Sequence, residues 1–218
     1  MKTLFVDIET IPRPEMRDIA SARIEKDYAR EGKVPTPEDI DRHMATIPQW
    51  CQIVGLGYAI GEAPICSRWV GDTKSSGEKA TEADLLTMFW YAVKDANHIV
   101  TYNGNYFDLN VIKWRTACLG VPVTRQFYDT KPWEFVSVDT FKSLFPNGAK
   151  FMFKLEEVLA CIGVELPEEL KTDVDGSMVK GLFEAGEIET LRRYNSADIW
   201  STREIARFGS GVYWPRVI

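Results

Sequence analysis

The chain has 218 residues, enough for one domain with a substantial hydrophobic core. Its 45% hydrophobic and 12% aromatic residues are typical of a globular protein and exclude disordered, collagen-like and coiled-coil proteins. The formal net charge of −6 argues against a protein that coats nucleic acid through bulk positive charge.

The N-terminal sequence reaches the carboxylate of Asp7 before an apolar run can develop, so we expect no signal peptide. No segment approaches the roughly 20 apolar residues of a membrane span. We therefore expect a soluble, cytoplasmic protein without a membrane partner. The four cysteines are widely spaced, which predicts reduced, mostly buried thiols. With two histidines in the chain, an enzyme of this sequence would depend mainly on carboxylates.

The first part of the chain combines short apolar segments with one polar insertion. Residues 3–7 are β-branched and apolar and predict a strand. Residues 52–60 and 65–70 predict two further strands that form a hairpin. A proline-rich stretch at 12–49, with a helical pattern at about 15–30, separates the first strand from this hairpin.

Alternating helices and strands follow, and the chain ends in helices. Thr81-Glu-Ala-Asp84 is a capping box that predicts a helix to about residue 96. The later predicted elements are a strand at 98–102, a helix at 106–119, a strand at 136–139 and helices at 154–162, 178–185 and 187–208. This order predicts an α/β fold, a mixed sheet with helices on both faces.

Acidic residues end the first predicted strand, in the segment Asp7-Ile8-Glu9. Because side chains alternate along a strand, Asp7 and Glu9 project from one face with Cα atoms about 6 to 7 Å apart. Two carboxylates so placed can share a divalent metal. The alternative is an acid pair that faces water, and the segment alone does not decide between them.

A second acidic segment, Asn103-Gly-Asn-Tyr-Phe-Asp108, lies where a strand is expected to end and a helix to begin. The helix dipole favours an acid in the first turn, and Asn-Gly suits a turn. Both observations also have a purely structural explanation, so this segment is weak evidence by itself.

The final predicted helix carries a third acidic position. An apolar stripe recurs at spacings of three and four, and Asp198 falls on it, one turn after Tyr194. A buried carboxylate needs a partner, and no lysine or arginine shares this stripe. A metal ion is one candidate. Backbone amides are the other, with Tyr194 packed beside them.

In this order the three segments resemble the exonuclease motifs of the DEDD superfamily: Asp7-Ile-Glu9-Thr, Asn103-x-x-x-Phe107-Asp108 and Tyr194-x-x-x-Asp198. The tyrosine four residues before the last aspartate is typical of the tyrosine subtype. Within that subtype the chain is most similar to predicted exonucleases related to the proofreading domain of family B DNA polymerases. Residues 47–54, 138–140 and 154–163 extend the similarity, whereas 13–46 form a variable insertion.

The resemblance implies a single exonuclease domain over residues 1–218 with a ribonuclease H-like fold. Its central mixed sheet would have five strands, the first three antiparallel, and a helical insertion would follow the first strand. It also implies an enzyme, a 3′–5′ exonuclease, which hydrolyses single-stranded DNA from the 3′ end and releases nucleoside 5′-monophosphates. Association with a DNA polymerase, in proofreading or DNA repair, would fit such an enzyme.

Two divalent cations, Mg²⁺ or Mn²⁺, are implied as cofactors, and ligation by oxygen alone suits these hard ions. By resemblance Asp7 bridges both ions, Glu9 and Asp198 complete the one that activates the water, and Asp108 supports the other. Tyr194 is expected to orient the attacking water, because a phenol with a pKa near 10 is a poor base at pH 7.

The strand-binding residues are less clearly indicated. Four residues beside the motifs are candidates for contacts with the 3′-terminal nucleotide: Thr10, Ile11, Asn103 and Phe107. A position in the hydrophobic core is an equally good explanation for Phe107.

Basic residues outside the motifs are candidates for phosphate contacts. Arg23, Lys26 and Arg30 form a stripe on the insertion helix, although a solvated charged face is the favoured explanation. Lys150, Lys154 and Lys171 are equally open candidates.

Two other functions remain open. An exoribonuclease of the same superfamily would share the ligand set and would differ in recognition of the 2′-hydroxyl. A non-catalytic single-strand-binding or polymerase-associated module would bind strands without shortening them.

Overall fold

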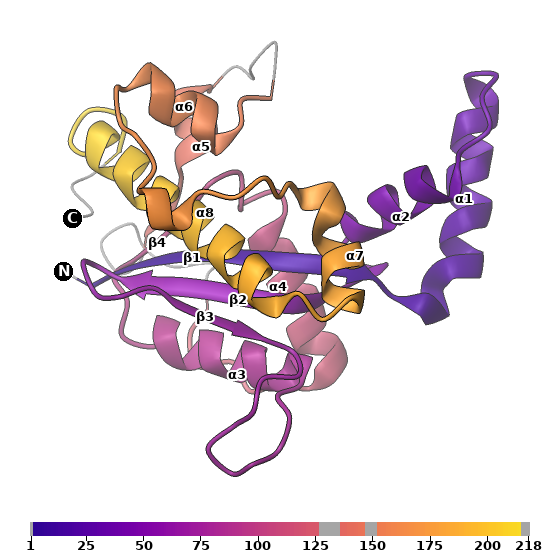
Figure 1. The fold of residues 1–218 in the computed structure, drawn as a ribbon, viewed down its shortest axis with the longest axis horizontal. Helices are drawn as coiled ribbons and strands as arrows, with labels where there is room; N and C mark the ends of the chain where they lie inside the picture. Colours follow the sequence, from indigo (N-terminus) through magenta and orange to yellow (C-terminus); the bar gives the residue numbers. More distant parts are fainter. Residues whose placement is uncertain (1, 127–135, 147–151, 215–218) are drawn as a thin grey trace.

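A five-stranded mixed sheet forms the centre of the computed structural model, which describes residues 2–126, 136–146 and 152–214 (Figure 1). Its strands are β1 (Thr3–Pro12), β2 (Cys51–Ile60), β3 (Cys66–Trp69), β4 (His98–Thr101) and β5 (Val136–Asp139), in the order β3-β2-β1-β4-β5. β1, β2 and β3 pair antiparallel, whereas β4 and β5 run parallel to β1. The predicted sheet and its antiparallel part are confirmed.

Helices cover both faces of this sheet, as expected (Figure 1). The α-helices are α1 (Arg17–Arg30), α2 (Pro37–Ala45), α3 (Glu82–Val93), α4 (Asp108–Leu119), α5 (Thr140–Leu144), α6 (Leu155–Cys161), α7 (Val179–Glu184) and α8 (Ile188–Gly209). Short 3-10 helices span Pro14–Met16, Glu168–Leu170 and Gly176–Met178. α3 and α4 cover one face, and α8 with α5 and α6 covers the other, so the chain has the predicted α/β, ribonuclease H-like architecture.

Alternation along β1 assigns its side chains to two separate cores. Leu4, Val6 and Ile8 pack into the core beneath α3 and α4, whereas Phe5 packs into the core beneath α8. Side chains two residues apart share a face, so Asp7 and Glu9 project toward α8. The pattern of apolar residues in β1 thus determines the face on which the acidic pair lies.

β1 is longer than residues 3–7, and the prediction that Asp7 and Glu9 end the strand was wrong. The strand continues to Pro12 because its pairing with β2 extends to Cys51, with a register shift between Glu9 and Thr10. Polar residues hid this continuation in the sequence. A bulge of this kind is common beside functional sites.

Two helices were not predicted, α2 and α5. α2 begins with Thr36, whose side chain caps the amide of Asp39 in a capping box, and Pro37 occupies the first turn. Proline is favourable there because its missing N–H would be unpaired in any case. α5 has five residues, too few to produce a helical pattern.

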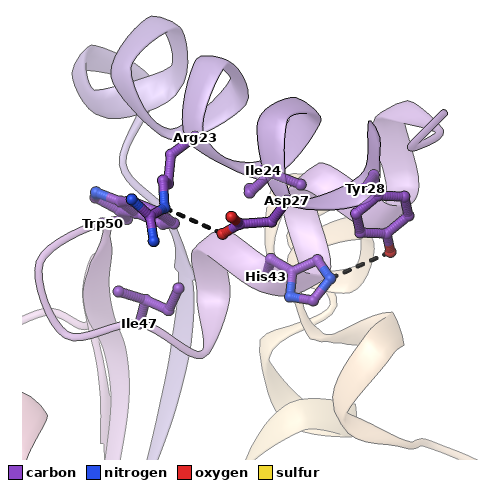
Figure 2. A pocket seen from close by; sticks show the side chains of 7 residues that line it. All are labelled: Arg23, Ile24, Asp27, Tyr28, His43, Ile47 and Trp50. Atoms are coloured by element: carbon purple, nitrogen blue, oxygen red, sulfur yellow. Dashed lines mark hydrogen bonds and ion pairs between the residues drawn. The ribbon is translucent and has the colours of Figure 1, made fainter. Parts of the chain in front are cut away.

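α1 and α2 form the helical insertion that follows β1 and extend from one end of the sheet (Figure 1). Between them, beside Trp50, lies a pocket of about 500 Å³ (Figure 2). On α1, Arg23 and Arg30 both pair with Asp27, at 3.0 and 2.9 Å. The two arginines of the basic stripe thus share one acid on their own helix and are exposed, which agrees with the favoured explanation of a solvated charged face.

Arg115 and Glu82 form a nearly buried ion pair that joins α3, α4 and β2. Glu82 accepts from Nε and Nη2 of Arg115, at 2.8 and 2.6 Å, and from the amide of Ile53 at 2.8 Å. We expect Arg115→Met to lower the free energy of unfolding by about 3 to 5 kcal/mol, because Glu82 would keep a buried charge without its partner. Urea unfolding measures this loss.

Arg23→Met is the matched control for that experiment. It removes an exposed arginine from its pair with Asp27 and is expected to leave the urea midpoint unchanged. Equal midpoints for both variants would contradict the importance assigned to Arg115.

Two further expectations concerned the burial of the cysteines and the presence of membrane-spanning helices. All four cysteines are free; Cys51 is buried, but Cys118 and Cys161 are exposed, so the prediction of mostly buried thiols was wrong for these two. Within the described ranges, no helix combines the length and apolar character needed to span a bilayer.

Candidate active site

Carboxylates from β1 and α8 converge on one face of the sheet. One oxygen each of Asp7, Glu9 and Asp198 lies within 4.8 Å of the others. Asp7 and Glu9 share the face of β1 that α8 covers, and Asp198 lies on the stripe of α8 that packs against the sheet. The structure thus brings together three of the predicted ligands, from positions almost 190 residues apart in the chain.

Asp108, the first residue of α4, joins this cluster from the neighbouring strand connection. Its Oδ1 accepts a hydrogen bond of 3.2 Å from the amide of Ile8, between the two acids of β1. β1 pairs with β4 only through Phe5, so Ile8 lies beyond that ladder and Asp108 supplies the acceptor. This contact holds the carboxylate of Asp108 next to Asp7.

Burial raises the pKa of all four carboxyl groups. For Asp7 and Glu9 desolvation is the largest cause, followed by repulsion from the other acids of the cluster. Desolvation raises the pKa of Asp108 to about 7 and that of Asp198 to about 7. At neutral pH, full ionisation of this cluster requires a counter-charge.

Among the described residues, no lysine or arginine forms an ion pair with Asp7, Glu9, Asp108 or Asp198. Four carboxylates that offer only oxygen donors suit hard divalent cations and not zinc. The residues present therefore fit a divalent-cation site.

Tyr194 lies one turn before Asp198 and hydrogen-bonds to its carboxylate. Burial and the neighbouring acids raise the pKa of its phenol far above the usual value near 10. This shift favours the protonated hydroxyl, which can donate a hydrogen bond and orient a neighbouring water.

A cleft of about 1130 Å³ opens over the cluster. The cleft is lined by four of the predicted residues: the strand-binding candidates Asn103 and Phe107 and the basic candidates Lys154 and Lys171. Phe107 also packs against the core beneath α3 and α4. Lys150 lies outside the described residues.

Thr10 and Ile11 are not brought to the cleft lining. The hydroxyl of Thr10 donates to the carbonyl of Ala45 at 2.6 Å, and the side chain of Ile11 is buried with Val54 and Leu191. Both residues connect β1 to its neighbours, and their contact with a strand stays a prediction.

The loop before α4 is held in an unusual conformation. Asn103 has φ of +61°, and both it and Asn105 donate their amides to the buried carboxylate of Asp139, at 3.0 Å each. A positive φ outside glycine is uncommon and needs such support. Asp139 therefore sets the path of the segment that ends in Asp108.

Sequence reasoning missed three residues of this site. The side chains of Tyr106 and Met152 are exposed and line the cleft, and Asn195 donates to Oδ2 of Asp7 at 2.8 Å. The sequence did offer a signal for Tyr106, because this aromatic residue stands between two motif positions. Asn195 had none, because its role depends on the packing of α8 against β1 to β3.

A family model matches residues 69–204 and is described as a predicted 3′–5′ exonuclease related to the exonuclease domain of PolB. The match covers more than half of the chain. The chain belongs to this family of exonucleases. The matched residues include Asp108, Tyr194 and Asp198, whereas Asp7 and Glu9 precede them. The geometry of the cluster brings these two acids together with Asp198, which lies within the matched residues.

The exonuclease fold also has a similar solved structure, that of the family B DNA polymerase from the hyperthermophilic archaeon Pyrobaculum calidifontis. The TM-score is 0.62 at 19% sequence identity, with 96% of this chain and 24% of the polymerase chain covered. This exonuclease thus spans about a quarter of that polymerase's length. No curated protein matches the chain.

Proposed function

We propose that this exonuclease hydrolyses single-stranded DNA from the 3′ end and releases nucleoside 5′-monophosphates. The observation that carries the proposal is the convergence of Asp7, Glu9 and Asp198 within 4.8 Å, beside Asp108. The relation of the family to the exonuclease domain of PolB supports DNA as the substrate.

Two divalent cations, Mg²⁺ or Mn²⁺, would be held by these four carboxylates, and Asp7 would contact both. Such ions, when bound, polarise an attacking water and neutralise charge on the phosphate. Asp7, Glu9 and Asp198 orient their oxygens toward one point, and Asp108 is kept beside it by the amide of Ile8. This ligand set and Tyr194 would place the chain in the tyrosine subtype of the DEDD exonucleases.

The cleft offers surfaces for a single strand. The ring of Tyr106 is exposed at the cleft and provides a face on which a base can stack, and Lys142 lies 5.2 Å from its centre. Lys154 and Lys171 line the same cleft and can meet phosphates. Asn103 and Phe107 lie beside the carboxylates, where the 3′-terminal nucleotide would be held.

Tyr194→Phe should lower kcat about 100-fold with little change in KM. The variant keeps the ring but removes the hydroxyl that orients the water, and a misplaced reactant costs a factor of this order. Single-turnover hydrolysis of a labelled strand measures the effect. Tyr58→Phe is the matched control, because Tyr58 packs on the opposite face of the sheet. A Tyr194→Phe enzyme of normal kcat would remove Tyr194 from the mechanism.

The decisive test is a side-by-side digestion of 5′-labelled single-stranded DNA, duplex DNA and RNA with Mg²⁺ or Mn²⁺. We expect a ladder that shortens from the 3′ end, fastest on single-stranded DNA, and no product with Asp7→Asn. Preference for RNA would make the protein an exoribonuclease. A protein that binds strands but never shortens them in Mn²⁺ would be a non-catalytic module, and the proposed activity would be wrong.

Association with a DNA polymerase is part of the same proposal. Support comes from the polymerase of similar fold, in which the matching region is one part of a longer chain. Co-purification of the exonuclease with a polymerase from its own source, retained at 150 mM salt, would support a complex, whereas separate elution would contradict it.

A further inference from the structure

A buried chain of hydrogen bonds leads to Asp7 from the edge strand β3, along the face of the sheet that α8 covers. Nε1 of Trp69 donates to Oγ of Ser67 at 3.1 Å, and Oγ of Ser67 donates to Oδ1 of Asn195 at 2.9 Å. Nδ2 of Asn195 then donates to Oδ2 of Asp7 at 2.8 Å. All three donors are buried, and Asn195 and Trp69 have no exposed surface at all.

The indole of Trp69 fixes the direction of this chain. An indole N–H can only donate, so Ser67 must accept from it and direct its own proton to Asn195. An amide that accepts at Oδ1 presents its NH₂ group on the other side. Asn195 therefore offers a donor, and never an acceptor, to Asp7. Oδ2 of Asp7 is held by this bond.

The sheet is built to admit the amide. Asp7, Gly57 and Ser67 form one row across β1, β2 and β3, because Asp7 pairs with Gly57 and Gly57 pairs with Ser67. A Cβ atom on Gly57 would lie 2.0 Å from Oδ1 of Asn195. The glycine in the middle of the row leaves the space in which Asn195 bridges the two outer residues.

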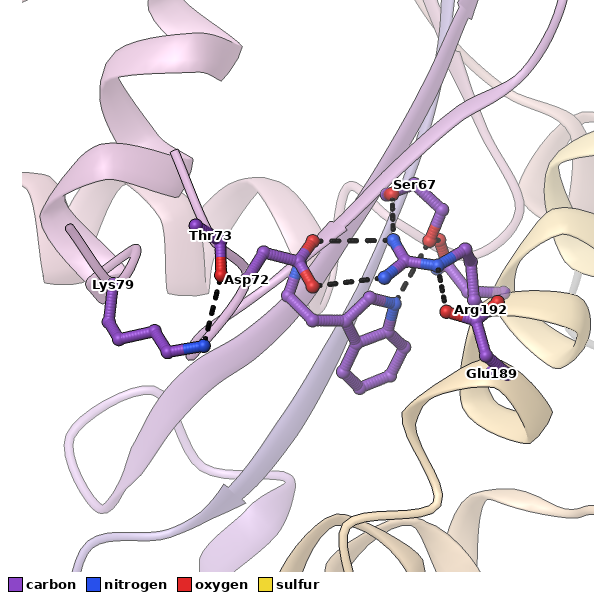
Figure 3. A network of polar contacts seen from close by, with 8 residues as sticks. Ser67, Asp72, Thr73, Lys79, Glu189 and Arg192 are labelled. Carbon is purple, nitrogen blue, oxygen red and sulfur yellow. Dashed lines mark hydrogen bonds and ion pairs between the residues drawn. The ribbon is translucent and has the colours of Figure 1, made fainter. Parts of the chain in front are cut away.

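A second set of contacts fixes α8 against β3 (Figure 3). Arg192, one turn before the amide, donates to the carbonyl of Ser67 and forms an ion pair of 2.9 Å with Asp72. Asp72 in turn accepts from the amide of Trp69 at 3.0 Å. These contacts hold β3, where this hydrogen-bond relay from Trp69 to Asp7 begins, against α8, which carries Asn195.

We propose that Asn195 is a positioning residue for Asp7, and that Trp69 and Ser67 set the orientation of its amide. The inference rests on the proposed function, since it assigns to this relay the placement of Asp7 for a divalent cation. Partners behind a ligand commonly govern metal affinity by a factor of about 10 to 100. The relay spans three strands and α8, so it also couples the cation site to the packing of that helix.

Calorimetric titration of the purified protein with Mn²⁺ alone tests the inference without reference to hydrolysis. Asn195→Ala should weaken Mn²⁺ binding about 10- to 100-fold, and Ser67→Ala, which leaves Asn195 in place but removes the donor to its Oδ1, about 3- to 10-fold. Ser196→Ala, the neighbouring polar residue on α8, is the control and should bind Mn²⁺ as the wild type does.

Two further readouts separate positioning from stability. If Asn195 only packs the helix, Asn195→Ala lowers the melting temperature but leaves Mn²⁺ affinity and the Mn²⁺ concentration for half-maximal hydrolysis unchanged, which overturns the inference. Should Asn195→Ala not fold, Ser67→Ala decides by the same titration, and wild-type affinity in that variant also overturns the inference.

The wild-type titration distinguishes this inference from the proposed function. Mn²⁺ binding by the wild type with equal binding by Asn195→Ala contradicts the relay alone. A wild-type protein that binds no Mn²⁺ contradicts the cation site and the relay together.

Discussion

Asp7→Asn should reduce strand hydrolysis by about 1000-fold or more and, in the absence of divalent cations, should make the protein more stable. The loss follows from removal of a central cation ligand, worth several kcal/mol of transition-state stabilisation. The gain in stability follows because Asp7 is half-buried beside three other carboxyl groups that repel it. An asparagine at this position can still accept from Asn195.

Activity and stability are measured on the same preparation. Hydrolysis of a labelled strand is followed in Mn²⁺, and thermal unfolding is followed in EDTA and in Mn²⁺. The exposed acid Asp95 supplies the control, since Asp95→Asn removes the same charge far from the cluster. Retained hydrolysis in Asp7→Asn would exclude the carboxylate cluster as the site of the chemistry. A lower melting temperature in EDTA would contradict the repulsion argument.

The second large effect is a link between cations, pH and stability. In EDTA we expect the melting temperature to fall as pH rises from about 4 to about 7. Asp108 and Asp198 have pKa values raised from 3.8 to about 7 in the folded protein. Between the unfolded and folded values, the folded state binds more protons, so stability decreases with rising pH.

Divalent cations should reverse this decrease, because they replace the protons as counter-charge. At about 100 times its dissociation constant a cation that binds only the folded state adds about 2.7 kcal/mol, or about 5 to 10 °C in melting temperature for a chain of this size. The shift should be larger at pH 8 than at pH 5. An equal melting temperature with EDTA and with Mn²⁺ at pH 8 would contradict the cation site.

Asp198→Asn provides the control for the pH dependence. It removes one group with a raised pKa, so its melting temperature in EDTA should vary less between pH 5 and pH 8. His98 contributes the opposite sign, because burial lowers its pKa and folded stability then rises with pH. That contribution is common to the wild type and the variant and cancels in the comparison.

The fold was largely predictable because its signals are local. The capping box at Thr81 predicted the start of α3, and Gly120, with φ of +64°, ends α4 where the sequence placed the stop. Short β-branched and apolar segments identified the strands, and their order with the helices gave the mixed sheet. α2 was hidden because prolines in its surroundings indicate loops, although Pro37 favours its first turn.

The candidate site was predictable only in part, because its remaining features depend on tertiary contacts. The acids Asp7 and Asp198 stand out because a carboxylate on a buried face needs an explanation. Asn195 does not stand out, since a polar residue on a helix is ordinary until Gly57 and Ser67 are placed beside it. Ile11 followed the first motif in sequence, but the alternation of β1 directs it into the core.

The position of β1 has a consequence for dividing the chain into fragments. Residues 69–204, the part that matches the family model, lack β1 and β2, and β1 is the strand that lies between β2 and β4. A fragment cut at that boundary would lose the middle of the sheet and apolar residues from both faces, on which α3 and α8 pack. Expression of this exonuclease as a shorter unit must therefore begin at the first strand, even though sequence comparison locates the family further along the chain.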